Sequence, residues 1–208
     1  MNNIELINWI HKQMVKGRSQ FIKYQSFRKI GFDGVRDTDY RFEVYKLKDY
    51  TTKDSVVLDM GCATGFLSMQ VAEFAKEVHG VEERDYLHNI SNLVKTALEI
   101  DNCTFYNKHV MNHYPTIKYD VVLSLSVHHW SVDKCKQYFD KINQLLKVGG
   151  VFLFESHHFK NDEAYKYYQL LCETALGSKF EKISSTRFVA AKGKQDREFT
   201  WFRKIYHL

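Results

Sequence analysis

The sequence predicts a single α/β domain built on a mostly parallel β-sheet with helices on both of its faces. Short apolar runs alternate with amphipathic stretches between about residues 55 and 176. These runs are apolar throughout, as expected of strands that are buried on both faces. The last two runs follow each other across the polar connection AAKGKQDR, which predicts a C-terminal antiparallel hairpin within a seven-stranded sheet.

Apolar residues at helical spacing predict N-terminal helices within residues 1–50. The first helix is expected over 4–14, the second over 19–30, and a third, short helix near Asp39. We expect these helices to form a lid or a substrate-binding extension. The remaining residues, 51–208, are then the core of the same domain, since 208 residues suit one α/β domain.

The predicted core alternates strands with helices. Strands of the parallel type are expected at 56–60, 78–82, 103–106, 119–127 and 151–156. Helices are expected at 66–75, 85–99, 133–147 and 162–176. The hairpin pairs residues 180–189 with residues 198–206. In such a sheet, ligands bind at the carboxyl ends of the strands, where the strand order reverses.

Composition and charge limit the class of protein. The net charge is +5, and it is uneven: residues 1–50 and 157–208 each hold ten Lys or Arg against six Asp or Glu, whereas 51–156 hold ten against thirteen. This distribution suits a polyanion such as RNA, although scattered solubilising lysines explain it equally well. No apolar run is long enough to cross a membrane, and the first residues lack the apolar stretch of a secretory signal.

The cysteines are widely spread, without the paired spacing of a metal site or a disulfide framework. They are predicted to be buried free thiols, so no metal site is expected. The lack of a membrane-spanning run and of a secretory signal predicts a cytoplasmic protein. The four cysteines are Cys62, Cys103, Cys135 and Cys172.

The turn after the first strand carries the clearest chemical signal. In VVLDMGCATGF, Asp59 lies near the end of the strand, and Gly61 and Gly65 lie in the turn to the next helix. Glycines allow the backbone to pass close to a ligand. The spacing is DxGxxxG and not the GxGxxG of dinucleotide-binding enzymes. Asp59 would repel a pyrophosphate but would attract the ammonium group of an amino acid.

Four stretches in order resemble the class I S-adenosylmethionine-dependent methyltransferases, which have a Rossmann-like fold. VVLDMGCATG resembles the first motif of that family and GVEER the second. YDVVLSLSVHHW is similar to the fourth motif, and LLKVGGVFLFES to the helix, turn and fifth strand that follow it. The resemblance implies an enzyme that transfers a methyl group and uses S-adenosyl-L-methionine.

The resemblance also assigns residues to parts of the cofactor. Glu82 would accept hydrogen bonds from both ribose hydroxyls, a task that suits the two oxygens of a carboxylate. The methionine end would lie near Asp59, Gly61, Cys62, Ala63 and Gly65. The adenine would lie near His109 and Val110, and the cofactor would pass over Ser124, Leu125 and Ser126.

Candidate proton acceptors follow the fourth and fifth strands, where both ends open onto the expected ligand crevice. They are His128 and His129 after the fourth strand, and Glu155, His157 and His158 after the fifth, with His129 and His157 as the leading candidates. A histidine titrates near neutral pH and therefore suits general-base work. One histidine of each pair is equally expected to have a packing role. An aromatic face, Trp130 or Tyr24, could attract the sulfonium.

The sequence favours RNA slightly over a small molecule as the methyl acceptor, on its charge distribution alone. Weaker likenesses to methyltransferases of the tRNA wobble uridine and of the RNA 5′-phosphate agree with this choice. Basic residues that could contact phosphates are Arg28, Lys29, Arg36, Arg41, Arg187, Lys192, Lys194 and Arg197. The alternatives are a small-molecule O- or N-methyltransferase and a non-catalytic module that binds the cofactor.

Overall fold

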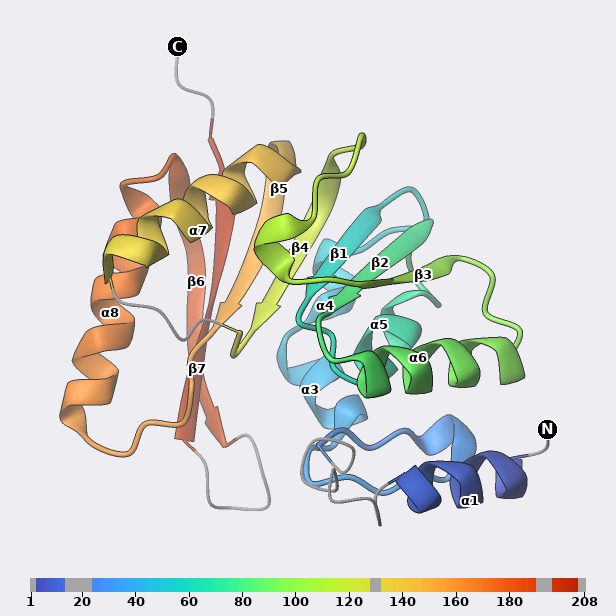
Figure 1. Ribbon diagram of the computed structural model, residues 1–208. Coiled ribbons are helices and arrows are strands. Elements are labelled where there is room, and N and C mark those ends of the chain that lie inside the picture. Colours follow the sequence, from blue (N-terminus) through green and yellow to red (C-terminus); the bar gives the residue numbers. More distant parts are fainter. Residues whose placement is uncertain (1–2, 14–23, 128–131, 190–195, 206–208) are drawn as a thin grey trace.

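The computed structural model describes residues 3–13, 24–127, 132–189 and 196–205. The sheet has seven strands in the order β3-β2-β1-β4-β5-β7-β6 (Figure 1). The strands are β1 (Val56–Met60), β2 (Glu77–Glu82), β3 (Cys103–Asn107), β4 (Tyr119–Leu125), β5 (Leu146–Glu155), β6 (Phe180–Val189) and β7 (Asp196–Lys204). The order reverses between β1 and β4, which is where a ligand site is expected.

The direction of the strands confirms the predicted fold class. β1 pairs in parallel with β2 and β4, and β4 pairs in parallel with β5. β7 is antiparallel to both of its neighbours, β5 and β6, so the C-terminal hairpin is also confirmed. This hairpin brings β7 beside β5, with Phe199 opposite Glu155.

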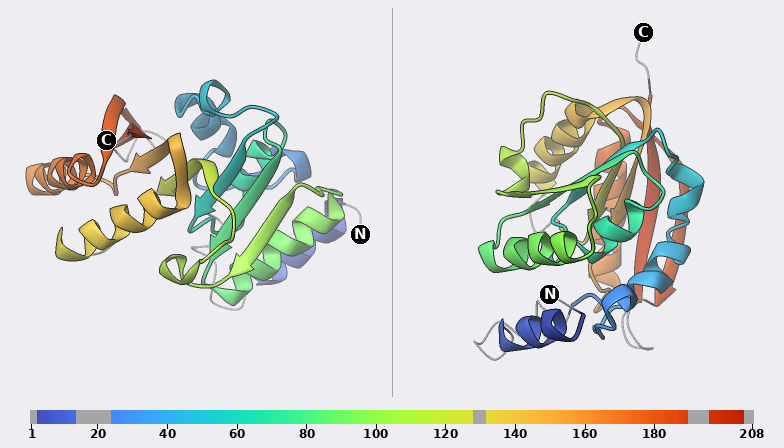
Figure 2. Two further views of the ribbon diagram at one scale, coloured as in Figure 1. Left: turned by 90° about the horizontal axis from the view of Figure 1, so that it is seen from above. Right: turned by 90° about the vertical axis from the view of Figure 1, so that its right-hand side faces the viewer.

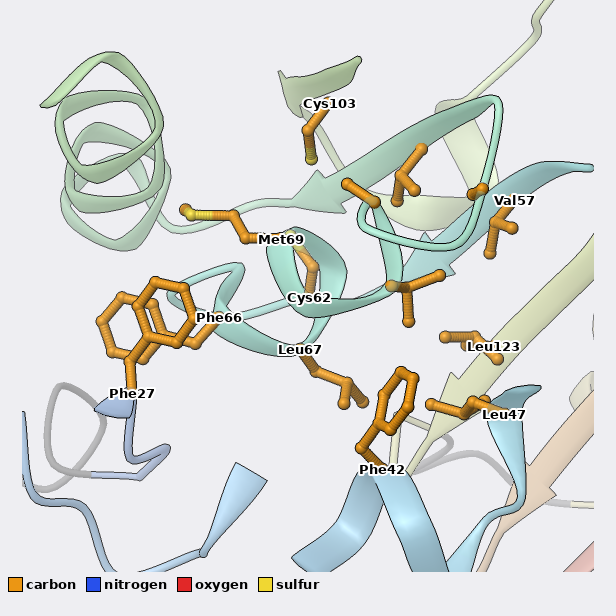
Figure 3. Close-up of a cluster of buried hydrophobic side chains, with 14 of the residues drawn as sticks. Phe27, Phe42, Leu47, Val57, Cys62, Phe66, Leu67, Met69, Cys103 and Leu123 are labelled. Atoms are coloured by element: carbon orange, nitrogen blue, oxygen red, sulfur yellow. The ribbon is translucent and has the colours of Figure 1, made fainter. Parts of the chain in front are cut away.

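Helices cover both faces of the sheet (Figure 2). They are α1 (Asn3–Gln13), α3 (Thr38–Val44), α4 (Leu47–Tyr50), α5 (Phe66–Val71), α6 (Asp85–Ala97), α7 (Val132–Leu145) and α8 (Asp162–Leu176). Alternate strand residues face two separate cores. Val57 and Val121 pack with the helices from α1 to α6, whereas Leu58 and Val122 pack with α7 and α8. The first core contains the stacked rings of Phe27 and Phe66 (Figure 3).

The prediction of a second N-terminal helix over 19–30 is wrong for residues 24–30, the part of this range that the structure describes. Residues 24–27 are mostly extended, and only Arg28–Ile30 form a single 3₁₀ turn, η2. The reason is that the backbone of this segment bonds to the chain just after it: Phe27 N–H donates to Phe32 O, and Ser26 N–H to Arg36 O. Residues 19–23 lie outside the described residues.

Three predicted helices also end earlier than expected. α6 ends at Ala97, although the sequence predicts a helix to residue 99. α5 ends at Val71, although the sequence predicts a helix to residue 75. α7 ends at Leu145, before the predicted end at residue 147. The cause at α7 is that β5 already begins at Leu146, which pairs with Tyr119 before a register shift.

We expect Gly65→Ala to lower the free energy of unfolding by about 2–4 kcal/mol, because it adds strain and a clash. Gly65 has a φ of +70°, and a Cβ on it would lie 2.5 Å from the Phe105 ring. Gly149→Ala is the matched control, since Gly149 has a φ of +76° but nothing within 4 Å of a Cβ. It should cost about 1 kcal/mol in urea unfolding. Equal losses in the two variants would show that the Phe105 contact is unimportant.

Candidate active site

A cavity of about 390 Å³ lies at the carboxyl ends of the central strands. This volume is in the ~300–1,000 Å³ range of small-molecule sites. Its wall is formed by the turn after β1, the ends of β2 and β4, and the segments after β3 and β5. The N-terminal part of the chain also reaches the cavity, through Tyr24. In Figure 1, α1 lies beyond the same edge of the sheet, at the bottom of the view.

The turn after β1 has the backbone that close approach to a ligand requires. Gly61, Ala63 and Gly65 all have positive φ values, between 54° and 72°. The N–H groups of Gly61 and Cys62 both donate to Val81 O, at 2.8 and 3.1 Å, which ties the turn to β2. Gly61 and Ala63 line the cavity. A Cβ on Gly61 would lie 2.8 Å from Val127, so this position has room only for glycine.

Glu82, the last residue of β2, is held in place on the cavity wall. One carboxylate oxygen accepts the N–H of Ala63 at 3.1 Å, and the other accepts the N–H of Arg84 at 3.0 Å. The residue is buried but lines the cavity. Because a carboxylate has about four lone-pair sites, both oxygens can accept further hydrogen bonds from a ligand.

His109 and Val110 lie after β3, on the cavity wall next to Glu82. His109 caps a short 3₁₀ turn, where its Nδ1 accepts the N–H of Met111 at 3.2 Å. Since Nδ1 is an acceptor there, the neutral ring carries its proton on Nε2.

Four of the predicted cofactor residues do not line the cavity. Asp59 is buried, and its carboxylate accepts the hydroxyl of Ser68 at 2.6 Å. Ser124 is also buried and shares a hydrogen bond with the Tyr138 hydroxyl at 2.7 Å. The other two are Cys62 and Gly65. Leu125, the last residue of β4, does line the cavity.

Asp59 should make the stability of the protein depend on pH. Burial raises its pKa to about 6 from the ordinary 3.8, despite the Ser68 hydroxyl. The folded protein therefore holds a proton that the unfolded chain releases, and stability falls as the pH rises from about 4 to above 6. The difference of about two pKa units corresponds to about 3 kcal/mol. Urea unfolding of wild type and Asp59→Asn between pH 4 and 7 tests this: a constant difference between them would contradict it.

Comparison with known proteins decides the family. Residues 51–203 match a family model described as a methyltransferase domain. The chain belongs to this methyltransferase family.

Curated relatives of this methyltransferase act on different acceptors. It is 36% identical to protein arginine N-methyltransferase 1 of Saccharomyces cerevisiae over 94 residues. These residues are 44% of this chain and 27% of that protein. It is 22% identical to malonyl-[acyl-carrier protein] O-methyltransferase of Bacillus cereus over 132 residues. These residues are 60% of this chain and 48% of that protein. The chain thus spans less than half the length of the curated relatives it matches.

Solved structures share the fold of this methyltransferase. The N-methyltransferase NodS from Bradyrhizobium japonicum superposes with a TM-score of 0.66 at 11% identity, covering 81% of this chain and 96% of that one. NodS has also been solved in complex with S-adenosyl-l-homocysteine. In the described part of this methyltransferase, none of the helices has the length and apolar character needed to cross a membrane.

The structure brings one of the predicted proton acceptors to the cavity wall, His157. His128 and His129, together with Trp130, lie outside the described residues. Glu155 is fully buried and does not line the cavity. Its carboxylate accepts the hydroxyls of Tyr45 and Ser126, each at 2.8 Å.

Glu155 is also paired with arginines, which decides its charge. Its Oε2 lies 3.5 Å from both Arg41 Nη2 and Arg197 Nη1. Burial alone would raise the pKa of Glu155, but Arg41, Arg197 and Arg36 outweigh burial and hold the pKa below its ordinary value. The group is therefore an ionised partner of arginines and a weak proton acceptor.

Ser126, which the sequence predicts beneath the cofactor, lines the cavity. Val127 and Arg197 also line it, and sequence reasoning did not place either of them there. The signal for Val127 was available, because it follows closely after the strand that carries Leu125. Arg197 could not be found in this way, since only the pairing of β7 with β5 brings it to the site. Its sequence position indicated an exposed hairpin, yet it is 6% exposed.

Proposed function

We propose that this methyltransferase binds S-adenosylmethionine along the cavity wall and methylates an O or N acceptor at its far end. The observation that carries the proposal is the fixed carboxylate of Glu82, which would bind the ribose hydroxyls. His109 and Val110 would bound the adenine. The methionine part would lie over Gly61 and Ala63, with Cys62, Gly65 and Asp59 behind them, and the cofactor would pass over Leu125, with Ser124 behind it.

The acceptor end of the cavity is bounded by Tyr24, Ser126, His157 and Arg197. The cofactor, when bound, supplies an activated methyl carbon on its sulfonium, so the chain has to orient the acceptor. Such positioning can contribute about 7–11 kcal/mol to lowering the barrier. His157 would take a proton from an acceptor that needs to lose one, and the sequence offers His128 and His129 as further candidates for this task.

The basic residues that suggested an RNA surface are mostly engaged within the protein. Arg28 pairs with Asp39 at 2.8 Å, Lys29 with Glu73 at 2.9 Å, and Arg187 with Asp196 at 2.5 Å. Three others are buried, namely Arg36, Arg41 and Arg197. Lys192 and Lys194 lie outside the described residues. Since three of these basic residues are buried and three are already paired with carboxylates, we propose a small molecule as the acceptor. We also propose that the protein acts in the cytoplasm.

Methyl transfer from methyl-labelled S-adenosylmethionine to a metabolite extract and, separately, to total RNA tests the proposal. We expect label in the metabolite fraction with little dependence on salt. Label in RNA that falls steeply with salt would instead make RNA the acceptor, because phosphate contacts release counterions. Cofactor binding without any transfer would favour a non-catalytic module. Glu82→Ala is the control that removes cofactor binding.

A further inference from the structure

Three buried arginines gather around one carboxylate at the acceptor end of the cavity. Arg36, Arg41 and Arg197 are 2%, 1% and 6% exposed, and Glu155 is fully buried. We call these four residues the arginine cluster. These three guanidinium groups lower the pKa of Glu155, and Asp59 is a second buried carboxylate that interacts with Arg41. Positive charges therefore outnumber negative ones in this buried cluster. An excess of buried positive charge is costly, so it indicates that a further negative charge belongs here.

Arg41 shows that the carboxylate does not satisfy the cluster. Its Nε donates to the Tyr45 hydroxyl at 2.9 Å, and its Nη2 lies 3.5 Å from Glu155. Its Nη1 is buried and has no hydrogen-bond partner among the described residues. The arginines also repel one another: burial lowers the pKa of Arg36, and Arg197 and Arg41 lower it further.

Arg197 is the member of the cluster that reaches the cavity wall. Arg197 donates two hydrogen bonds to described residues, both from Nη1. One is to Ser126 Oγ and the other, at 3.3 Å, is to Ser156 O. The same nitrogen is 3.5 Å from Glu155. Nε is buried and has no hydrogen-bond partner among the described residues, whereas Nη2 is not fully buried. Nη2 is thus the nitrogen that a molecule in the cavity can contact.

We propose that the methyl acceptor carries an oxyanion, a carboxylate or a phosphate, and that Arg197 binds it through Nη2. This inference rests on the proposed function. Ser126 and Glu155 fix the guanidinium plane, so little side-chain freedom is lost when the anion binds. Ser126 follows Leu125, which places the anion beside the part of the cavity assigned to the cofactor. A cationic acceptor, such as a protein arginine, would be repelled by the cluster.

The test is anion binding to the protein, with and without saturating S-adenosylhomocysteine, in a low-chloride buffer. Sodium acetate and inorganic phosphate are the probes, and amide shifts in NMR report millimolar binding. The variants are Arg197→Gln and Arg203→Gln. Arg203 is the matched control, because it is on the same strand and its side chain is 48% exposed beside Glu181.

We expect wild type to bind at least one anion and Arg197→Gln to bind it about tenfold or more weakly, as loss of a charge-assisted hydrogen bond predicts. Arg203→Gln should bind like wild type. The preferred probe identifies the acceptor as a carboxylate or a phosphate. If Arg197→Gln does not fold, Arg197→Lys replaces it: an ammonium cannot hold Ser126 and also reach the anion, so binding should again weaken.

Two results would overturn the inference: no binding of either anion to wild type, or equal binding to wild type and a folded Arg197 variant. Both leave the proposed function intact if S-adenosylhomocysteine binds with its normal affinity. Failure of S-adenosylhomocysteine to bind wild type would reject the proposed function instead. The anion titrations without S-adenosylhomocysteine still decide the role of Arg197 in that case.

Discussion

Glu155→Gln is expected to lower the free energy of unfolding by about 3–5 kcal/mol, because it leaves buried arginines without their counter-charge. The amide can keep contacts with Tyr45 and Ser126, so the loss reports the charge. Urea unfolding at pH 7 measures it. The effect is large because both partners of the pair with Arg41 are at most 1% exposed.

The matched control is Glu181→Gln, which removes a carboxylate that is half exposed beside Arg203. Exposed pairs of this kind contribute about 0–1 kcal/mol. A similarly small loss in Glu155→Gln would mean that the buried carboxylate is not a structural anion, and would make it available again as a catalytic base.

The pH dependence of the Glu155→Gln effect has a defined sign. The pKa of Glu155 is below its ordinary value in the folded protein, so its carboxylate stabilises the fold fully above the ordinary value of 4.5. That contribution is lost as the pH falls through the lower, folded-state pKa. The difference between wild type and variant should therefore be constant above about pH 5.5 and shrink in acid, opposite to the trend expected for Asp59.

Glu82→Ala is expected to weaken S-adenosylhomocysteine binding at least about 100-fold. Two charge-assisted hydrogen bonds to ribose hydroxyls are worth about 3–6 kcal/mol together. The variant also frees the N–H groups of Ala63 and Arg84, which loosens the turn that lines the cavity. Isothermal calorimetry measures the dissociation constants of the variant and wild type.

Glu82→Gln should have a smaller effect, because the amide keeps one acceptor oxygen. We expect its affinity for S-adenosylhomocysteine to fall about tenfold. Glu43→Ala is the control, because its side chain is 69% exposed and pairs only loosely with Lys48. Unchanged affinity in Glu82→Ala would show that the ribose does not bind to this carboxylate. It would also contradict the proposed orientation of the cofactor.

Much of the fold could be predicted because its parallel strands are continuous apolar runs. Val57, Leu58, Val121 and Val122 are all buried, on alternate faces, as such runs predict. The C-terminal hairpin could also be predicted, from the polar connection between its two strands. The segment 24–36 was not, since its apolar residues at helical spacing are instead paired through backbone bonds between Phe27 and Phe32.

The candidate site divides in the same way. The turn residues Gly61 and Ala63 and the strand end Glu82 follow local patterns, and the structure has them on one wall. The environment of Glu155 depends on contacts distant in sequence. Strand alternation puts it on the face of Leu153, toward the core that contains Tyr45 of the N-terminal segment, and the hairpin adds Arg197. No spacing in the sequence brings these groups together.

The central claim is that this methyltransferase binds its cofactor in the cavity next to Glu82. A crystal structure of the complex with S-adenosylhomocysteine tests it most directly. We predict ribose hydroxyls within about 3 Å of the Glu82 carboxylate, the adenine against Val110, and the homocysteine over Gly61 and Ala63. Density for the ligand elsewhere, or in this cavity but away from Glu82, would contradict the account.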